Sequence, residues 1–300
     1  MKLFLSAFLA VLVLAMPTAQ AALNVLTCEP EWAALTQELA GDLAKVSSAT
    51  TALQDPHHIE ARPALLAKAR RADLLICTGA ELEIGWLPLL QREAGNGNIQ
   101  PGQSGYFEAA RFARIIERPT TLDRAQGDVH ATGNPHLHLD PHNIAQVAEA
   151  LAKRLAEIDP SNAERYVERN RDFQVRWAAA IGRWEEQAAG LKGVPVVVHH
   201  KNWSYLADWL GLVVISDLEP KPGVEPSAAH LAALMGTLKS KPAKMVLRSA
   251  YQSPKPSQWL ASRVGIAAVE LPYTVGGSTQ ATDLFSLYDD TLRRLKESAQ

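Results

Sequence analysis

The sequence predicts an α/β protein of two lobes, each a mostly parallel sheet flanked by helices, joined by one long rigid helix. Two observations carry this prediction. Short β-rich runs alternate with helical patterns before residue 120 and again after residue 190, which is typical of parallel sheets. A single apolar stripe at helical spacing lies between these regions. With 300 residues, 47% of them hydrophobic, the chain is long enough for two cores.

The first 21 residues have the features of a secretory signal peptide. Lys2 precedes an apolar run over residues 3–16, and a small-x-small triplet ends at Ala21. We expect cleavage after Ala21 or Ala22, and a soluble mature protein in the periplasm. Cys28 lies too far beyond the apolar run to resemble a lipid-attachment cysteine.

The N-terminal lobe is predicted over residues 22–159. Strands are expected at residues 23–27, 45–50, 73–77 and 113–117, and helices at residues 30–44, at 62–71 and from Glu83 onward. The stretch 95–105 is rich in Gly, Asn, Gln and Pro, which indicates an exposed loop. After His142 the apolar residues recur at helical spacing until Asp159-Pro160 interrupts the pattern.

A long connecting helix is predicted over residues 160–190. Its apolar positions form one stripe: Tyr166, Phe173, Trp177, Ile181, Trp184 and Ala188. A coiled coil is an alternative, but a single stripe without clean heptads favours a connector packed along both lobes. The C-terminal lobe, residues 191–300, repeats the alternation: strands are expected near 194–198, 212–216, 244–248 and 266–271, with helices at 203–210, 226–238, 256–262 and from Asp283.

The chain has two cysteines, Cys28 and Cys77, each at the end of a strand-like run. Export permits a stable disulfide, and the ends of parallel strands are neighbours, so we predict a Cys28–Cys77 bond. Two separate buried thiols remain the alternative.

Histidines concentrate where strand-like runs end. Eight of the nine fall in three groups, at residues 57–58, 130–142 and 199–200. The densest stretch is NPHLHLDPHN, residues 134–143. If it is extended, His136 and His138 share one face, and Asp140-Pro141 then begins a helix. Because ligands bind beyond the carboxyl ends of parallel strands, the three groups are expected to meet in one cleft. A polar loop rich in histidine by chance is the alternative.

The chain contains four motifs in this order: DPHHIEARP, ADLLICTGAELE, PHLHLDP and HHKNWSYLADWLGL. Together they resemble the metal-specific substrate-binding proteins of ABC importers, in the group that carries zinc or manganese, and more specifically its zinc-uptake type. The resemblance covers nearly the whole mature chain. It implies two α/β lobes joined by a rigid helix, a bare divalent ion bound between them, and delivery of that ion to a membrane permease.

The resemblance also implies the ligands. His57 stands six residues before Pro63, His136 begins the H-x-W-L-x-P pattern, and His200 stands five residues before Tyr205. His138 replaces the usual Trp of the second pattern. His58, the neighbour of His57, and His138 are therefore auxiliary candidates.

The fourth ligand of the family is a carboxylate from the last strand-to-helix loop. The usual Leu-Asp-Pro is missing here, and Asp283 is the carboxylate in that loop. Asp283 is the expected ligand, with a helix N-cap as its alternative role. Glu270 or water would otherwise complete the site. His130, in the segment where some relatives carry a His-rich loop, is a further auxiliary candidate.

Three imidazoles and one carboxylate suit tetrahedral Zn²⁺, whereas Mn²⁺ favours more oxygen ligands. We therefore expect zinc. The resemblance implies an ABC permease as partner, and a periplasmic metallochaperone is a further candidate partner. We expect the protein to be a monomer. The formal net charge of −2 gives no basic surface for nucleic acid.

An exported zinc hydrolase is a rival, because catalytic zinc also has three protein ligands. Glu60 would be its nearest general base. The sequence has no HExxH or GxSxG motif, so we expect no enzyme activity. A zinc chaperone without a transporter is the second rival, sharing the site but not the partner.

Overall fold

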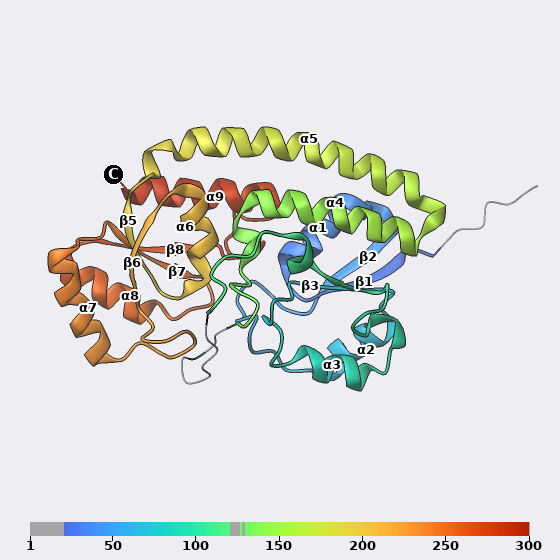
Figure 1. Cartoon of the computed structure of the whole chain (residues 1–300), viewed down its shortest axis with the longest axis horizontal. Helices are drawn as coiled ribbons and strands as arrows, with labels where there is room; N and C mark the ends of the chain where they lie inside the picture. The colour runs from blue at the N-terminus through green and yellow to red at the C-terminus, as the bar shows by residue number, and fades with distance from the viewer. Residues whose placement is uncertain (1–20, 121–126, 128–129, 300) are drawn as a thin grey trace, which may run out of the picture.

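Two four-stranded parallel sheets form the centres of two lobes (Figure 1). This computed structural model describes residues 21–120, 127 and 130–299, so residues 1–20 of the predicted signal peptide lie outside the described part. The first sheet has the order β2-β1-β3-β4, with β1 Leu23–Thr27, β2 Ala44–Ser48, β3 Leu74–Cys77 and β4 Tyr106–Glu108. The second has the order β6-β5-β7-β8, with β5 Pro195–Val198, β6 Val213–Asp217, β7 Met245–Ser249 and β8 Ala267–Leu271. The predicted fold class is confirmed.

Helices bury both faces of each sheet. Within the described residues they are α1 Pro30–Ala40, α2 Pro63–Arg71, α3 Leu87–Ala94, α4 Pro141–Ile158, α5 Ala163–Ala188, α6 Ser204–Leu210, α7 Ala228–Ser240, α8 Pro254–Val264 and α9 Leu284–Ala299. In β3, Leu74 and Ile76 enter the core that holds α1, while Leu75 and Cys77 enter the core that holds α2 and α3. This alternation explains why β3 is apolar throughout.

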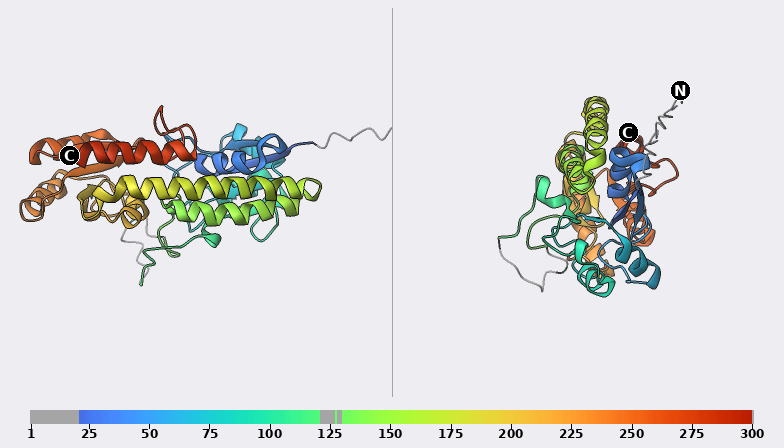
Figure 2. Two further views of the ribbon diagram at one scale, coloured as in Figure 1. Left: turned by 90° about the horizontal axis from the view of Figure 1, so that it is seen from above. Right: turned by 90° about the vertical axis from the view of Figure 1, so that its right-hand side faces the viewer.

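The connecting helix α5 runs along one side of both lobes (Figure 1). Its 26 residues correspond to about 39 Å, and it contacts α1, α4 and α9. Figure 2 shows α1 and α9 lying end to end beside it. One element therefore packs along helices of both lobes. Among the described helices, none is both long enough and apolar enough to cross a membrane.

Aromatic rings fix α5 to α9. Trp177 lies 4.9 Å from Phe285 and Trp184 lies 4.8 Å from Tyr288, measured between ring centroids. Both indoles are fully buried, and the Trp184 N–H donates to the Asp289 carboxylate at 2.6 Å. The predicted apolar stripe is thus the buried face of α5, except that Ala180 takes the fully buried position assigned to Ile181, which is half-buried.

Two local predictions were wrong. Residues 113–117 are not a strand: their backbone bonds to side chains, the Arg114 N–H to Asn143 at 2.9 Å and the Ile116 N–H to the Tyr205 hydroxyl at 3.2 Å. The fourth strand of the sheet is Tyr106–Glu108, which pairs with β3. The helix expected from Glu83 begins at Leu87, because Glu83 turns inward to accept bonds from the backbone of residues 78 and 79.

The predicted disulfide is confirmed. Cys28 follows β1 and Cys77 ends β3, and these strands pair in the sheet. Their Cα atoms lie 4.7 Å apart and the sulfurs are bonded. Parallel pairing aligns the two strand ends, so the sheet itself brings the cysteines together.

Two buried acids, Glu29 and Glu83, lie beside this bond and both accept hydrogen bonds from Thr78. The Thr78 hydroxyl donates to Glu29 at 3.0 Å and its N–H donates to Glu83 at 2.7 Å. Burial raises the pKa of Glu83 to about 7. Burial, followed by the negative charges of Glu83 and Glu31, raises the pKa of Glu29 well above its ordinary value. The pair therefore resists ionising together.

This arrangement predicts a pH-dependent stability. The pKa of Glu83 is raised in the folded protein, so the folded chain keeps a proton that the unfolded chain loses above pH 4.5. The contribution of Glu83 to the free energy of unfolding therefore falls as the pH rises from 4.5 through 7. Between pH 5 and pH 7 the stability of Glu83→Gln should rise by about 2 kcal/mol relative to that of wild type, beyond any constant cost of the lost acceptor. Urea unfolding at both pH values, with exposed Glu93→Gln as control, measures this slope. Equal slopes in all three proteins would disprove it.

Candidate metal site

Three histidines from distant parts of the chain converge between the sheets. The nearest ligand nitrogens of His57, His136 and His200 all lie within 4.8 Å of one another, and all three residues are buried. Their ring centroids are 5.4 to 5.7 Å apart. His57 lies between β2 and α2, and His200 is the second residue after β5. His136 precedes α4. The site thus receives side chains from both lobes.

Each of these imidazoles is held through its Nδ1 atom. The His57 Nδ1 lies 2.7 Å from the Asp55 carboxylate, the His200 Nδ1 lies 2.7 Å from Glu219, and the His136 Nδ1 lies 2.6 Å from the Tyr273 hydroxyl. A bond at Nδ1 fixes the ring and leaves Nε2 as the free lone pair, as in carboxylate–histidine–zinc arrangements. The His57 Nε2 is buried and has no hydrogen-bond partner.

These three supporting residues were not predicted. Asp55 stands two positions before His57, and Glu219 follows β6 in the sequence DLEP, so acidic residues near strand ends were an available signal. Tyr273, two residues after β8, had no such signal. Its position beside His136 depends on how the two lobes pack.

Burial lowers the pKa of two histidines at the site, His136 and His130. Burial, followed by repulsion from His57 and His200, lowers the pKa of His136 well below its ordinary value. The same causes lower the pKa of His130 to about 4. Because only neutral imidazole binds metal, these two rings need not lose a proton first at neutral pH.

Asp283 does not join the cluster. Its carboxylate accepts a 2.8 Å bond from the Ser286 N–H, so it caps α9, and it is exposed. This is the alternative role weighed for it from the sequence. Glu270 forms an ion pair with Arg248. Each expected carboxylate thus has a structural partner of its own.

The two auxiliary neighbours also lie apart from the three Nε2 atoms. His58 is exposed, with its ring 6.2 Å from that of His57. His138 is buried; its Nε2 lies 2.9 Å from the Tyr273 carbonyl, and its Nδ1 lies 3.1 Å from the Glu31 carboxylate without the geometry of a hydrogen bond. The predicted shared face of His136 and His138 is wrong because residues 137–139 form a 3-10 turn, not a strand.

His130 lies closer to the cluster than expected for an auxiliary residue. Its ring stacks on His57 at 5.4 Å and lies 6.5 Å from His136. With His136 and His200 it lines a cavity of about 290 Å³. The His130 Nε2 is buried without a hydrogen-bond partner.

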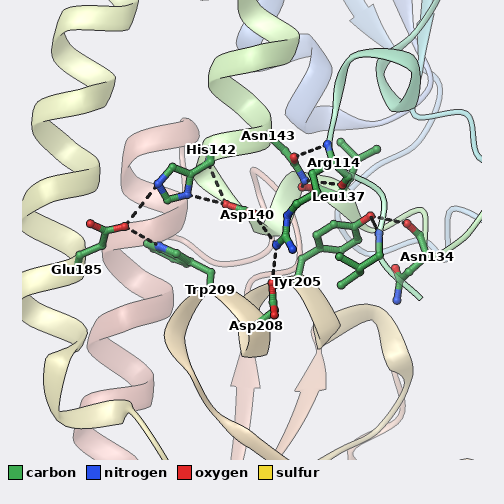
Figure 3. Close-up of polar contacts among 11 residues, drawn as sticks. Arg114, Asn134, Leu137, Asp140, His142, Asn143, Glu185, Tyr205, Asp208 and Trp209 are labelled. Carbon is green, nitrogen blue, oxygen red and sulfur yellow. Dashed lines mark hydrogen bonds and ion pairs between the residues drawn. The ribbon is translucent and has the colours of Figure 1, made fainter. Parts of the chain in front are cut away.

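A polar network ties the lobes together next to the site (Figure 3). Arg114 bonds Asp140 at 3.3 Å and also pairs with Asp208 on α6. The Tyr205 hydroxyl, also from α6, donates to the Asn134 carbonyl at 2.8 Å. The segment that carries His136 is thereby fixed to the C-terminal lobe.

His142 belongs to this network and not to the metal cluster. Its Nδ1 lies 2.9 Å from Asp140, the N-cap of α4, and its Nε2 lies 3.5 Å from Glu185 on α5. The Trp209 N–H of α6 also reaches Glu185, at 3.4 Å. Figure 3 shows these side chains bridging α4, α5 and α6.

The fold and the site together define a class of protein. Two similar α/β lobes on one rigid helix, with a buried group of free imidazole nitrogens between them, form a substrate-binding protein for a metal ion. The family model for zinc-uptake complex component A, periplasmic, matches residues 25–298. The chain therefore belongs to this family of periplasmic metal-binding components.

Individual relatives are distant, and the two ZnuA proteins match most of this chain. The high-affinity zinc uptake system protein ZnuA of Bacillus subtilis is 22% identical over 264 residues, covering 86% of this chain and 81% of that protein. ZnuA of Paracoccus denitrificans is 24% identical, with 80% of each chain covered. The manganese ABC transporter lipoprotein PsaA of Streptococcus pneumoniae is 29% identical, but the match covers only 48% of this chain and 44% of that protein.

Solved structures share the fold. A crystal structure of ZnuA superposes with a TM-score of 0.76 at 23% identity, covering 93% of this chain and all of the other. A zinc-bound ZnuA deletion mutant gives a TM-score of 0.71 at 25% identity, with 93% and 96% covered.

Proposed function

We propose that this protein captures one Zn²⁺ between its lobes in the periplasm and delivers it to the permease of an ABC importer. The observation that supports zinc is the buried trio of His57, His136 and His200, each with Nδ1 bonded and with one ligand nitrogen of each within 4.8 Å of the others. Nitrogen-rich tetrahedral sites suit Zn²⁺ at about 2.0 to 2.1 Å per bond. Mn²⁺, which relatives such as PsaA are named for, favours oxygen ligands.

A rigid frame accompanies this site. The aromatic contacts of α5 with α9, together with the Arg114 and Tyr205 contacts between lobes, oppose a wide hinge opening. We propose a small closure on binding and release, of the kind in which packed elements shift slightly. The protein is proposed to act as a monomer, with a periplasmic metallochaperone as a candidate donor of zinc.

Zinc uptake by cells tests the transport role. In the source organism, deletion of this gene should reduce radioactive zinc uptake under chelation, and the wild-type gene should restore it. His200→Ala should fail to restore uptake at equal protein levels. Uptake that is unchanged by the deletion would instead indicate a zinc chaperone without a transporter.

The supporting carboxylate of His200 should tune affinity. Glu219→Gln removes the charge that orients the His200 ring and raises its basicity, so zinc affinity should fall about 10- to 100-fold. Competition titration against a chromophoric chelator measures it. Glu225→Gln is the matched control, because Glu225 is an exposed carboxylate lining the cavity beside Glu219. An equal loss in both variants, or none in Glu219→Gln, would contradict the role.

A further inference from the structure

Three imidazoles leave a tetrahedral zinc ion one ligand short. The two carboxylates expected to complete the set are engaged elsewhere, Asp283 in capping α9 and Glu270 in an ion pair with Arg248. The missing ligand must therefore come from another side chain or from water.

His130 has the properties of that side chain. Its ring stacks on His57 at a centroid distance of 5.4 Å, and it shares one cavity with His136 and His200. Its buried Nε2 has no hydrogen-bond partner, and a buried polar atom without a partner is costly unless something binds it. The His130 nitrogens lie outside the 4.8 Å group, so ligation requires the side chain to turn toward the three Nε2 atoms.

The backbone after His130 is held in place. The Ala131 N–H donates to the Glu81 carboxylate, and the Gly133 N–H donates to the His130 carbonyl at 3.1 Å. Gly133 has φ 112°, and a Cβ there would lie 2.5 Å from the Ile115 side chain, so only glycine permits this close packing. These contacts present His130 to the cavity.

Other histidines are poorer candidates for the fourth position. The His138 Nε2 bonds the Tyr273 carbonyl and its Nδ1 faces the Glu31 carboxylate, and His58 is exposed. His199 lines the cavity on the Glu219 side, with its Nε2 4.0 Å from the carboxylate that holds His200. Among the described histidines outside the trio, His130 alone combines ring contact with His57 and a place in the cavity shared by His136 and His200.

We propose that His130 is the fourth protein ligand, which makes the centre a four-imidazole site. This inference rests on the proposed zinc function and specifies its selectivity. A site without a carboxylate disfavours Mn²⁺, which prefers oxygen. Zinc is therefore selected by the donor set itself.

Zinc X-ray absorption of the purified mature protein tests the proposal directly. The imidazole scattering of the wild type should fit four histidines, and that of His130→Ala should fit three. Zinc affinity of His130→Ala should fall at least about tenfold. His58→Ala is the matched control, since His58 also lies beside His57 but is exposed; its spectrum and affinity should equal those of the wild type.

Three imidazoles in the wild type, with an unchanged spectrum and affinity in His130→Ala, would overturn the assignment and leave the zinc function intact. A wild-type protein that binds no zinc would overturn the proposed function itself. Thermal unfolding of the metal-free variants verifies that each folds, which limits the comparison to ligation.

Discussion

His136→Ala should lose zinc affinity by more than about 100-fold, beyond what the loss of an outer-shell partner costs. His136 is the most buried of the three clustered histidines, with 1% of its surface exposed, and its ring is fixed by Tyr273. Alanine removes one of the three clustered ligand nitrogens. Competition titration with a chelator measures the loss. His57→Ala and His200→Ala should behave alike.

The control lies in the same short stretch. His142→Ala removes an imidazole six residues from His136, but this ring contacts Asp140 and Glu185 and not the cluster. Its zinc affinity should stay within about threefold of wild type, because no ligand is lost. If His136→Ala binds zinc as tightly as His142→Ala, the site has been placed incorrectly.

Removal of the Cys28–Cys77 bond should destabilise the protein by about 4 kcal/mol. The bond closes a loop with a sequence separation of 49 residues, and the loop-entropy relation for that length gives this value. Urea unfolding of the double variant Cys28→Ala, Cys77→Ala, compared with oxidised wild type at one pH, measures the difference. The same variant should retain zinc binding, since neither cysteine contacts the histidine cluster.

Reduced wild type is the control for the two lost sulfur atoms. If the bond acts through loop closure, reduction alone should give most of the destabilisation seen in the double variant. A stability difference below about 1 kcal/mol between oxidised and reduced wild type would contradict the estimate.

The sequence was sufficient for the architecture because local patterns there agree with the tertiary fold. Alternating strand and helix patterns predicted both parallel sheets, and the stripe from Tyr166 to Ala188 predicted α5. Parallel pairing of β1 with β3 made the Cys28–Cys77 bond predictable. In each case the signal lies within one segment or in two adjacent strands.

The errors arose where distant residues decide the local structure. Residues 113–117 contain two β-branched isoleucines, which favour a strand, yet side chains of Asn143 and Tyr205 hold them outside the sheet. The 3-10 turn at residues 137–139 separates His138 from His136, and the Tyr273 carbonyl then engages His138. No local pattern contains these contacts.

In the site, too, some residues could be assigned from local motifs and others depend on distant contacts. His57, His136 and His200 were identified from motifs around strand ends, and the structure brings them together. Asp283 was assigned from its place in a loop, but capping of α9 occupies it. The place of His130 beside His57 depends on how its loop folds across the site, which no spacing in the sequence reveals.

The most direct test of the central claim is the zinc stoichiometry of the purified mature protein. Metal-free protein should take up one tightly held Zn²⁺ per chain, measured by elemental analysis after dialysis, and should prefer Zn²⁺ to Mn²⁺ in competition. The triple variant His57→Ala, His136→Ala, His200→Ala should retain none while remaining folded. One tightly held zinc ion in that triple variant, or none in the wild type, would contradict the account.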